Sequence, residues 1–106
     1  IAQEQDARKP PMAILRIRTP AGKEAVYRLP NREVRIGRSP ACHIRLQNDR
    51  VSRNHAAIEP TPEGFLLTDL GSGNGTFVNG YPVTSHVLRH GDEVRVGNTR
   101  MRFYMQ

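Results

Sequence analysis

Three short polar clusters hold the side chains and glycines of this chain that are best suited to binding an anion. The first is Gly37-Arg38, the second spans residues 51–56 (VSRNHA), and the third spans residues 69–80 (DLGSGNGTFVNG). Each cluster combines cationic, hydroxyl or amide side chains with residues that turn the backbone, and each lies between segments that favour strands. Loops of this composition can bind one phosphate together where they meet at one end of a β-fold.

Each cluster offers a different group to such an anion. Arg38 follows a glycine that ends an expected strand, so its planar guanidinium is placed at the rim of the sheet to donate two parallel hydrogen bonds. Ser52 and Arg53 add a hydroxyl donor and a second cation within one tight turn. The alternate glycines of the third cluster let an extended ligand approach the main chain. The structural alternative is a solvated arginine and a serine that caps a turn.

Other chemistries fit these clusters less well. A nucleotide-binding loop needs Lys-Ser/Thr after its last glycine and a helix behind it, but here Thr76 enters an expected hairpin. Ser52, His55 and Asp69 supply the side-chain types of a hydrolase triad, yet no nucleophile-elbow motif accompanies them. We therefore expect no catalytic residue and no enzyme activity.

A metal site is not expected either, and neither is a cofactor. The candidate ligands lack paired positions at a recognisable spacing. His86 and His90 are four residues apart, but in an expected strand and turn that spacing does not bring them together. The candidates are Cys42, His43, His55, His86 and His90.

Alternation of apolar and polar residues predicts many short strands and no helix. Asn79-Gly80 is a strong hairpin signal, because both positions tolerate a positive φ. Gly37 ends the third strand, and residues 60–63 are expected to form a hairpin loop. Such a pattern is typical of an antiparallel sandwich or barrel, in which the loops gather at the two ends. The expected strands span residues 13–19, 24–29, 34–36, 43–46, 56–59, 64–69, 76–78, 81–83, 93–96 and 99–105.

The length of 106 residues suits one compact domain, which we place at residues 13–106. Residues 1–12 (IAQEQDARKPPM) have no periodic apolar pattern and are expected to be a flexible tail or linker. No stretch has the length of a membrane span or the pattern of a signal peptide, which favours a cytoplasmic location. The first residue is Ile1 rather than Met, so we expect a piece of a larger protein, and Cys42 as the single cysteine allows no internal disulfide.

The net charge of +6 and the pI near 10.4 predict an acidic partner. Most arginines occupy alternate positions of expected strands, which favours a solvated sheet face over a stripe that binds DNA. Aromatic residues make up 6% of the chain, too few for the stacking platforms that single-stranded nucleic acids use. Nucleic-acid binding and a scaffold module without phosphate affinity are the alternatives.

Taken together, the three clusters resemble the signature blocks of the forkhead-associated (FHA) domain. The blocks occur in the family's order and at suitable spacings, and the match runs over residues 34–80. The resemblance implies an all-β, FHA/SMAD-like sandwich of two twisted antiparallel sheets with about eleven short strands. It also implies a signalling module that binds phosphothreonine made by a Ser/Thr kinase, with no membrane insertion. The blocks are Gly37-Arg38, Ser52-Arg53-Asn54-His55 and Ser72-Gly73-Asn74-Gly75-Thr76 with Asn79-Gly80.

The resemblance also implies a role for each matching residue. Arg38 and Ser52 would bind the phosphate oxygens, and Arg53 would add a contact from the same loop. Asn74 would bond the peptide backbone beside the phosphothreonine, with the N–H of Gly73 next to it. The residues implied to hold the loops in shape are Gly37, His55, Gly75 and Asn79.

Two positions bear on affinity and specificity. The family often has threonine or serine where this chain has Gly73, so only a backbone N–H is left there, and we expect a lower affinity. Arg50 lies just before the Ser52 turn. From its charge alone, we expect it to select an acidic residue downstream of the phosphothreonine.

Overall fold

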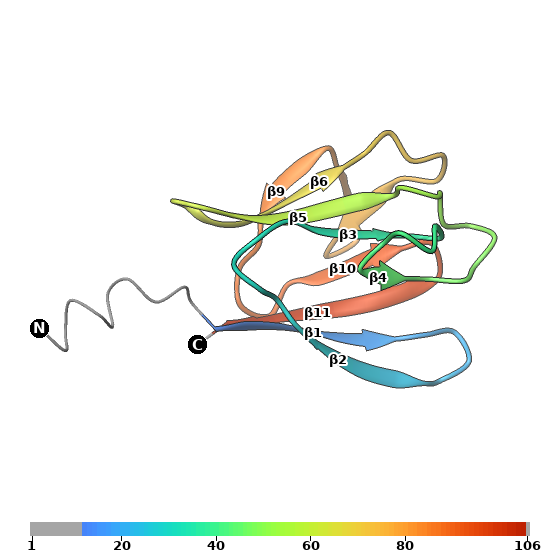
Figure 1. Cartoon of the computed structure of the whole chain (residues 1–106), viewed down its shortest axis with the longest axis horizontal. Coiled ribbons are helices and arrows are strands. Elements are labelled where there is room, and N and C mark those ends of the chain that lie inside the picture. The colour runs from blue at the N-terminus through green and yellow to red at the C-terminus, as the bar shows by residue number, and fades with distance from the viewer. Residues whose placement is uncertain (1–11, 106) are drawn as a thin grey trace, which may run out of the picture.

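The structure is a computed structural model that describes residues 12–105, which form two β-sheets packed face to face (Figure 1). The six-stranded sheet has the order β2-β1-β11-β10-β7-β8, and the five-stranded sheet has the order β4-β3-β5-β6-β9. The strands are β1 (Ala13–Arg18), β2 (Glu24–Arg28), β3 (Val34–Gly37), β4 (Ile44–Arg45), β5 (Ala56–Thr61), β6 (Gly64–Asp69), β7 (Thr76–Val78), β8 (Tyr81–Val83), β9 (Ser85–Val87), β10 (Glu93–Val96) and β11 (Thr99–Met105).

The core lies between the sheets and is built mainly from alternate residues of β1, β3, β5, β6, β10 and β11. In the β1–β11 pair, Leu15 lies opposite Phe103 and Ile17 opposite Met101, and three of these four side chains are completely buried. Phe65 of β6 meets Phe103 edge to face across the sandwich, with ring centroids 5.9 Å apart. Because the side-chain period of a strand is two, this register places the intervening polar residues on the outer faces.

The fold expected from the sequence is confirmed: eleven strands, two sheets and no helix among residues 12–105. Local differences follow from pairing. β9 was not expected; it pairs with β6. β5 continues through Pro60 and Thr61, so the hairpin turn is shorter than predicted. The alternation of residues 24–29 also predicts that Ala25 faces inward, but it is exposed because β2 is an edge strand.

One pair departs from the antiparallel pattern, since β3 and β4 run parallel. The expected tail falls on residues 1–11, which lie outside the described residues, and on Met12. No helix within residues 12–105 has the length and apolar character needed to cross a membrane.

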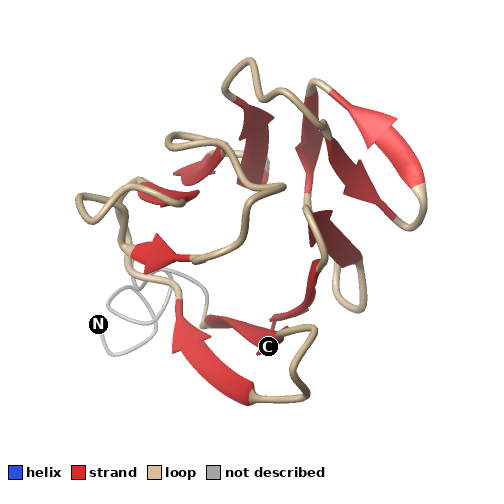
Figure 2. Cartoon of the chain, turned by 90° about the vertical axis from the view of Figure 1, so that its right-hand side faces the viewer, coloured by secondary structure: helices blue, strands red, loops and turns tan. Residues whose placement is uncertain are grey.

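The loops after β3, β4 and β6 lie at the end of the sandwich that is opposite the C-terminus (Figures 1 and 2). We name them the first loop (residues 38–43), the second loop (residues 46–55) and the third loop (residues 70–75). They contain Arg38, residues 51–55 and residues 70–75 of the three polar clusters recognised in the sequence.

Candidate functional site

Backbone and side-chain hydrogen bonds join the three loops into one unit. The N–H groups of Arg38 and Ser39 donate to the carbonyls of Ser52 and Arg53, at 3.0 and 3.1 Å, which joins the first loop to the second. The N–H of Gly73 donates to Ser52 Oγ at 3.0 Å, which joins the third loop to the second. The three loops therefore meet at one end of the fold, as expected, whereas the Asn79-Gly80 part of the third cluster lies elsewhere.

Arg38 is exposed, and a hydrogen bond from its guanidinium to the second loop fixes the side chain in place. Its Nε donates to the carbonyl of Val51 at 3.0 Å, and Val51 is buried against the core. Within residues 12–105, the two terminal nitrogens of this guanidinium form no hydrogen bond. The arrangement fixes the plane of the cation and leaves its outer edge for an anion.

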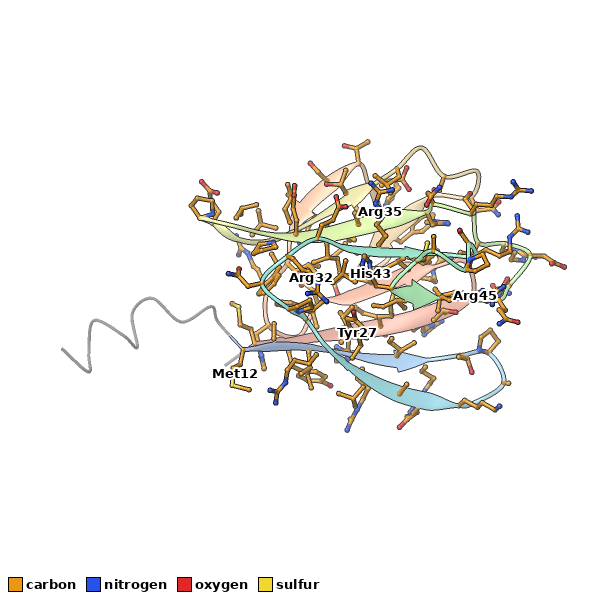
Figure 3. All side chains as sticks on the ribbon, in the orientation of Figure 1. Met12, Tyr27, Arg32, Arg35, His43 and Arg45 are labelled. Atoms are coloured by element: carbon orange, nitrogen blue, oxygen red, sulfur yellow. The ribbon has the colours of Figure 1, made fainter. Side chains whose placement is uncertain are left out.

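Two further arginines surround Arg38 in a shallow pocket lined by Arg38, Ser39, Pro40, Arg45 and Arg53. Arg45 Nε donates to the carbonyl of Arg38 at 3.2 Å, and Figure 3 shows Arg45 near the same end of the molecule. Sequence reasoning missed Arg45 and assigned it to a solvated sheet face. The parallel pairing of Arg45 with Gly37 brings it into the pocket, and no local motif signals such a pairing.

His55 is buried beneath the loops and stabilises them through hydrogen bonds. The imidazole is completely buried, its Nδ1 accepts the N–H of Ser52 at 3.0 Å, and its Nε2 lies 2.8 Å from the carbonyl of Gly75. Because Nδ1 accepts, Nε2 must carry the proton and donate. Nδ1 thus ties the second loop to itself, and Nε2 connects it to the third loop.

Asp69 shapes the third loop, a role that sequence reasoning missed. Its carboxylate accepts hydrogen bonds from Ser72 Oγ at 2.6 Å, Thr76 Oγ1 at 2.7 Å and the N–H groups of Gly71 and Ser72. Burial opposes the charged form, but these hydrogen bonds outweigh it and lower the pKa of Asp69. A serine three residues after an aspartate is a turn signal that could have revealed this role.

The arrangement does not form a hydrolase triad. His55 bonds the backbone of Ser52 rather than its hydroxyl, and Asp69 bonds residues of its own loop. Among residues 12–105, no three His, Cys, Asp or Glu side chains are grouped to hold a metal ion.

Gly37 is required by a close approach of two chain segments. A Cβ built on it would lie 2.1 Å from the carbonyl oxygen of Arg53 and 3.0 Å from Cys42 Sγ. The Cys42 thiol itself donates to that carbonyl at 3.3 Å. Any larger residue at position 37 would push the first and second loops apart.

Gly75 and Asn79, the other two residues expected to support the loops, lie in different parts of the fold. Gly75 lies in the third loop with φ +87°, a backbone conformation that favours glycine. Asn79 lies in the β7–β8 turn with φ 51°, and its amide bonds Asp92 and the N–H of Glu93. The contacts of Asn79 are thus with the start of β10, because the turn after β7 lies at the far end of that strand from the third loop.

Gly73 and Asn74 form the rim of the third loop. Asn74 is exposed, and its Nδ2 donates to the carbonyl of Arg50 at 2.8 Å. The N–H of Gly73, expected to be available to a ligand, here contacts Ser52 Oγ. A Cβ on Gly73 would approach nothing closer than Ser52 Oγ at 3.9 Å, so the position has room for a side chain.

Known proteins share both the sequence and the fold. The family model of the FHA domain matches residues 34–97. The glycogen accumulation regulator GarA of Mycobacterium tuberculosis is 46% identical over 67 residues, which cover 63% of this chain and 41% of GarA. The oxoglutarate dehydrogenase inhibitor of Corynebacterium diphtheriae is 40% identical over 92 residues, which cover 78% of this chain and 64% of the inhibitor. The chain thus spans about two fifths to two thirds of these relatives.

Solved structures agree with this result. A structure from a study of phosphothreonine-dependent FHA domain interactions has a TM-score of 0.79 and 33% identity, covering 88% of this chain and 97% of its own. EmbR of Mycobacterium tuberculosis in complex with a low-affinity phosphopeptide has a TM-score of 0.79 and 29% identity, covering 88% of this chain and 24% of EmbR. With the family model matching more than half of its length, this chain belongs to the FHA domain family.

Proposed function

We propose that this FHA domain binds phosphothreonine in partner proteins through the three joined loops. The observation that carries the proposal is a fixed and exposed cation, Arg38, whose Nε is held by the carbonyl of Val51 while its terminal nitrogens form no hydrogen bond within residues 12–105. The relatives support it, since their solved structures concern phosphothreonine-dependent interactions and a phosphopeptide complex.

In this proposal Arg38, Ser52 and Arg53 bind the phosphate oxygens. A phosphate carries roughly −1.5 to −2 charge at neutral pH. Each hydrogen bond from a charged group contributes on the order of 1.5 to 3 kcal/mol. Because the loops form a shallow surface, the phosphate supplies most of the binding free energy.

Gly73 and Asn74 of the rim, together with Arg50 of the second loop, are proposed to contact the peptide rather than the phosphate. We assign Asn74 to the peptide backbone, which fixes the register of the phosphothreonine. Gly73 lies beside it, and its N–H would have to exchange its contact with Ser52 Oγ for one with the peptide. Arg50 lies beside Asn74 and is exposed, so its guanidinium is a candidate for selecting an acidic residue downstream.

The module itself is proposed to be non-catalytic and to act in the cytoplasm, where a Ser/Thr kinase creates its ligand. Residues 13–106 constitute the FHA domain, and residues 1–12 are a tail or linker within a larger signalling or scaffold protein. The relatives named as a regulator and an inhibitor support this role.

A set of matched peptides tests the proposal. Oriented libraries carrying phosphothreonine, phosphoserine, phosphotyrosine or plain threonine are titrated against the domain by fluorescence anisotropy. We expect binding to phosphothreonine peptides alone. Equal affinity for the plain threonine peptides would overturn the proposal, and so would affinity that ignores peptides and follows DNA with a steep salt dependence.

A further inference from the structure

The outer face of the six-stranded sheet places arginines directly opposite one another. Arg16 of β1 pairs with Arg102 of β11, and Arg18 pairs with Arg100. Residues directly opposite in an antiparallel pair have their Cβ atoms about 4.5–5.5 Å apart on the same face. Like charges in this position destabilise a sheet. We name these four residues the arginine cluster.

The glutamates on this face neutralise the cluster only in part. Arg18 Nη2 lies 2.6 Å from Glu24, and Glu93 is shared between Arg102 at 3.4 Å and Arg100 at 4.0 Å. Arg95 extends the positive face, because it lies opposite Arg100 on β10. Arg28 of β2 lies on the same face, so within these described strands six arginines face two glutamates.

The cluster forms a surface that a ligand can reach. The side chains of Arg18 and Arg100 are 68% and 65% exposed, and that of Arg102 is 45% exposed. All four arginines line one hollow, together with the two glutamates and Tyr104. The residues that line this hollow do not overlap with those around Arg38. The cluster is a second basic site.

We propose that the arginine cluster binds an extended acidic segment of a partner protein, with carboxylates at alternate residues. Arg16 and Arg18 are two residues apart on one strand, as are Arg100 and Arg102 on the next. Two residues of an extended strand span about 6.6 Å. An extended Glu-x-Glu or Asp-x-Asp segment repeats its carboxylates at the same distance, so each can meet one arginine of a row.

Groups already on this face show the chemistry of that contact. Glu24 Oε1 accepts hydrogen bonds from both Nε and Nη2 of Arg18, at 3.1 and 2.6 Å. A carboxylate of the partner would accept hydrogen bonds from a guanidinium of this face in a similar way. Val26 lies opposite Arg16 and is 61% exposed, so it can contact the aliphatic part of a peptide.

The aromatic residues of this face make a nucleic acid the weaker fit. Arg95 covers the ring of Phe77, with its guanidinium carbon 4.1 Å from the ring centroid. The ring of Tyr104 packs edge to face against His90. The covered face of Phe77 is therefore not an open platform on which a base could stack, and Tyr104 is a single ring rather than a row of platforms.

The test uses a fluorescein-labelled peptide of alternating glutamate and serine, titrated against the whole chain at low salt. The double variant Arg16→Gln/Arg102→Gln removes one directly opposed pair from the exposed face. We expect it to weaken binding of this peptide about tenfold. Its binding of a phosphothreonine peptide should be unchanged, and its thermal midpoint should change little, because the repulsion that is lost offsets the lost contacts of Arg102 with Gly91 and Glu93.

The matched control is Arg32→Gln/Arg35→Gln, which removes the same charge from exposed residues of the β2–β3 turn and β3. We expect less than a twofold effect from it. Equal losses in both double variants would show attraction by net charge alone and overturn the proposal. Tighter binding of an oligothymidylate of equal charge, lost in the same Arg16/Arg102 variant, would assign the face to nucleic acid instead.

Discussion

The loop site and the arginine cluster are both basic, but they are built in different ways. Arg38 and Arg45 of the loop site donate to backbone carbonyls, which fixes their positions without any partner. Arg18 and Arg102 of the cluster bond only side chains of neighbouring strands and the carbonyl of Gly91. The first arrangement suits one anion of defined shape, whereas the second suits a row of separate charges.

The two regions also depend on different parts of the fold. The loop site depends on single buried groups, above all His55, that hold irregular backbone in place. The cluster depends on the register of β1, β2, β10 and β11, which the core fixes through many residues at once. A single substitution can therefore disrupt the first without changing the second.

The largest effect is expected from His55→Ala. It removes a buried ring and leaves the N–H of Ser52 and the carbonyl of Gly75 without partners, so the free energy of unfolding should fall by about 3 kcal/mol. Urea denaturation measures this change. The control is His43→Ala, because His43 is exposed and accepts one backbone N–H, from Arg35. A similar small loss in both variants would contradict the bracing role of His55.

Arg38→Ala should weaken phosphothreonine binding by about 2 kcal/mol, roughly thirtyfold. The same variant should bind the alternating glutamate peptide as the unaltered chain does, because Arg38 is not part of the cluster. Anisotropy titrations with both peptides measure the two affinities. An intact domain with unchanged phosphopeptide affinity would exclude Arg38 from the site.

Lowering the pH from 7 to 5.5 should separate the two sites chemically. The phosphate has its second pKa near 6 and gains a proton, so its affinity for the loop site should fall about fourfold. Glutamate has a pKa near 4.3 and stays mostly ionised, so the cluster should keep its ligand. Parallel titrations at both pH values measure the difference, and an equal fall at both sites would remove this distinction.

The smallest effect is a gain in affinity. Gly73→Thr supplies the hydroxyl that relatives often carry, into a position where an added Cβ meets only Ser52 Oγ at 3.9 Å. We expect phosphothreonine affinity to rise by about 0.5 kcal/mol, roughly twofold. Gly73→Ala is the control, since it adds the Cβ without the hydroxyl. Equal affinities of the two variants would show that no hydroxyl contact forms.

Alternation and turn chemistry predicted most strands, because each depends on neighbours in the sequence. The hairpin at Asn79-Gly80 is an example. β9 escaped prediction because its three residues are stabilised by pairing with β6, and the extension of β5 through Pro60 depends on pairing as well. Pairing between strands leaves little trace in the sequence of a segment as short as three residues.

For the candidate site, the sequence by itself determined which residue types stand in the three clusters and, through their order and spacing, the family. Only the tertiary structure decided that Arg45 joins the pocket of Arg38 and that Arg16 lies opposite Arg102. The physical reason is the same in each case. These relations depend on the pairing of strands and loops distant in the chain, which the packed core of both sheets fixes.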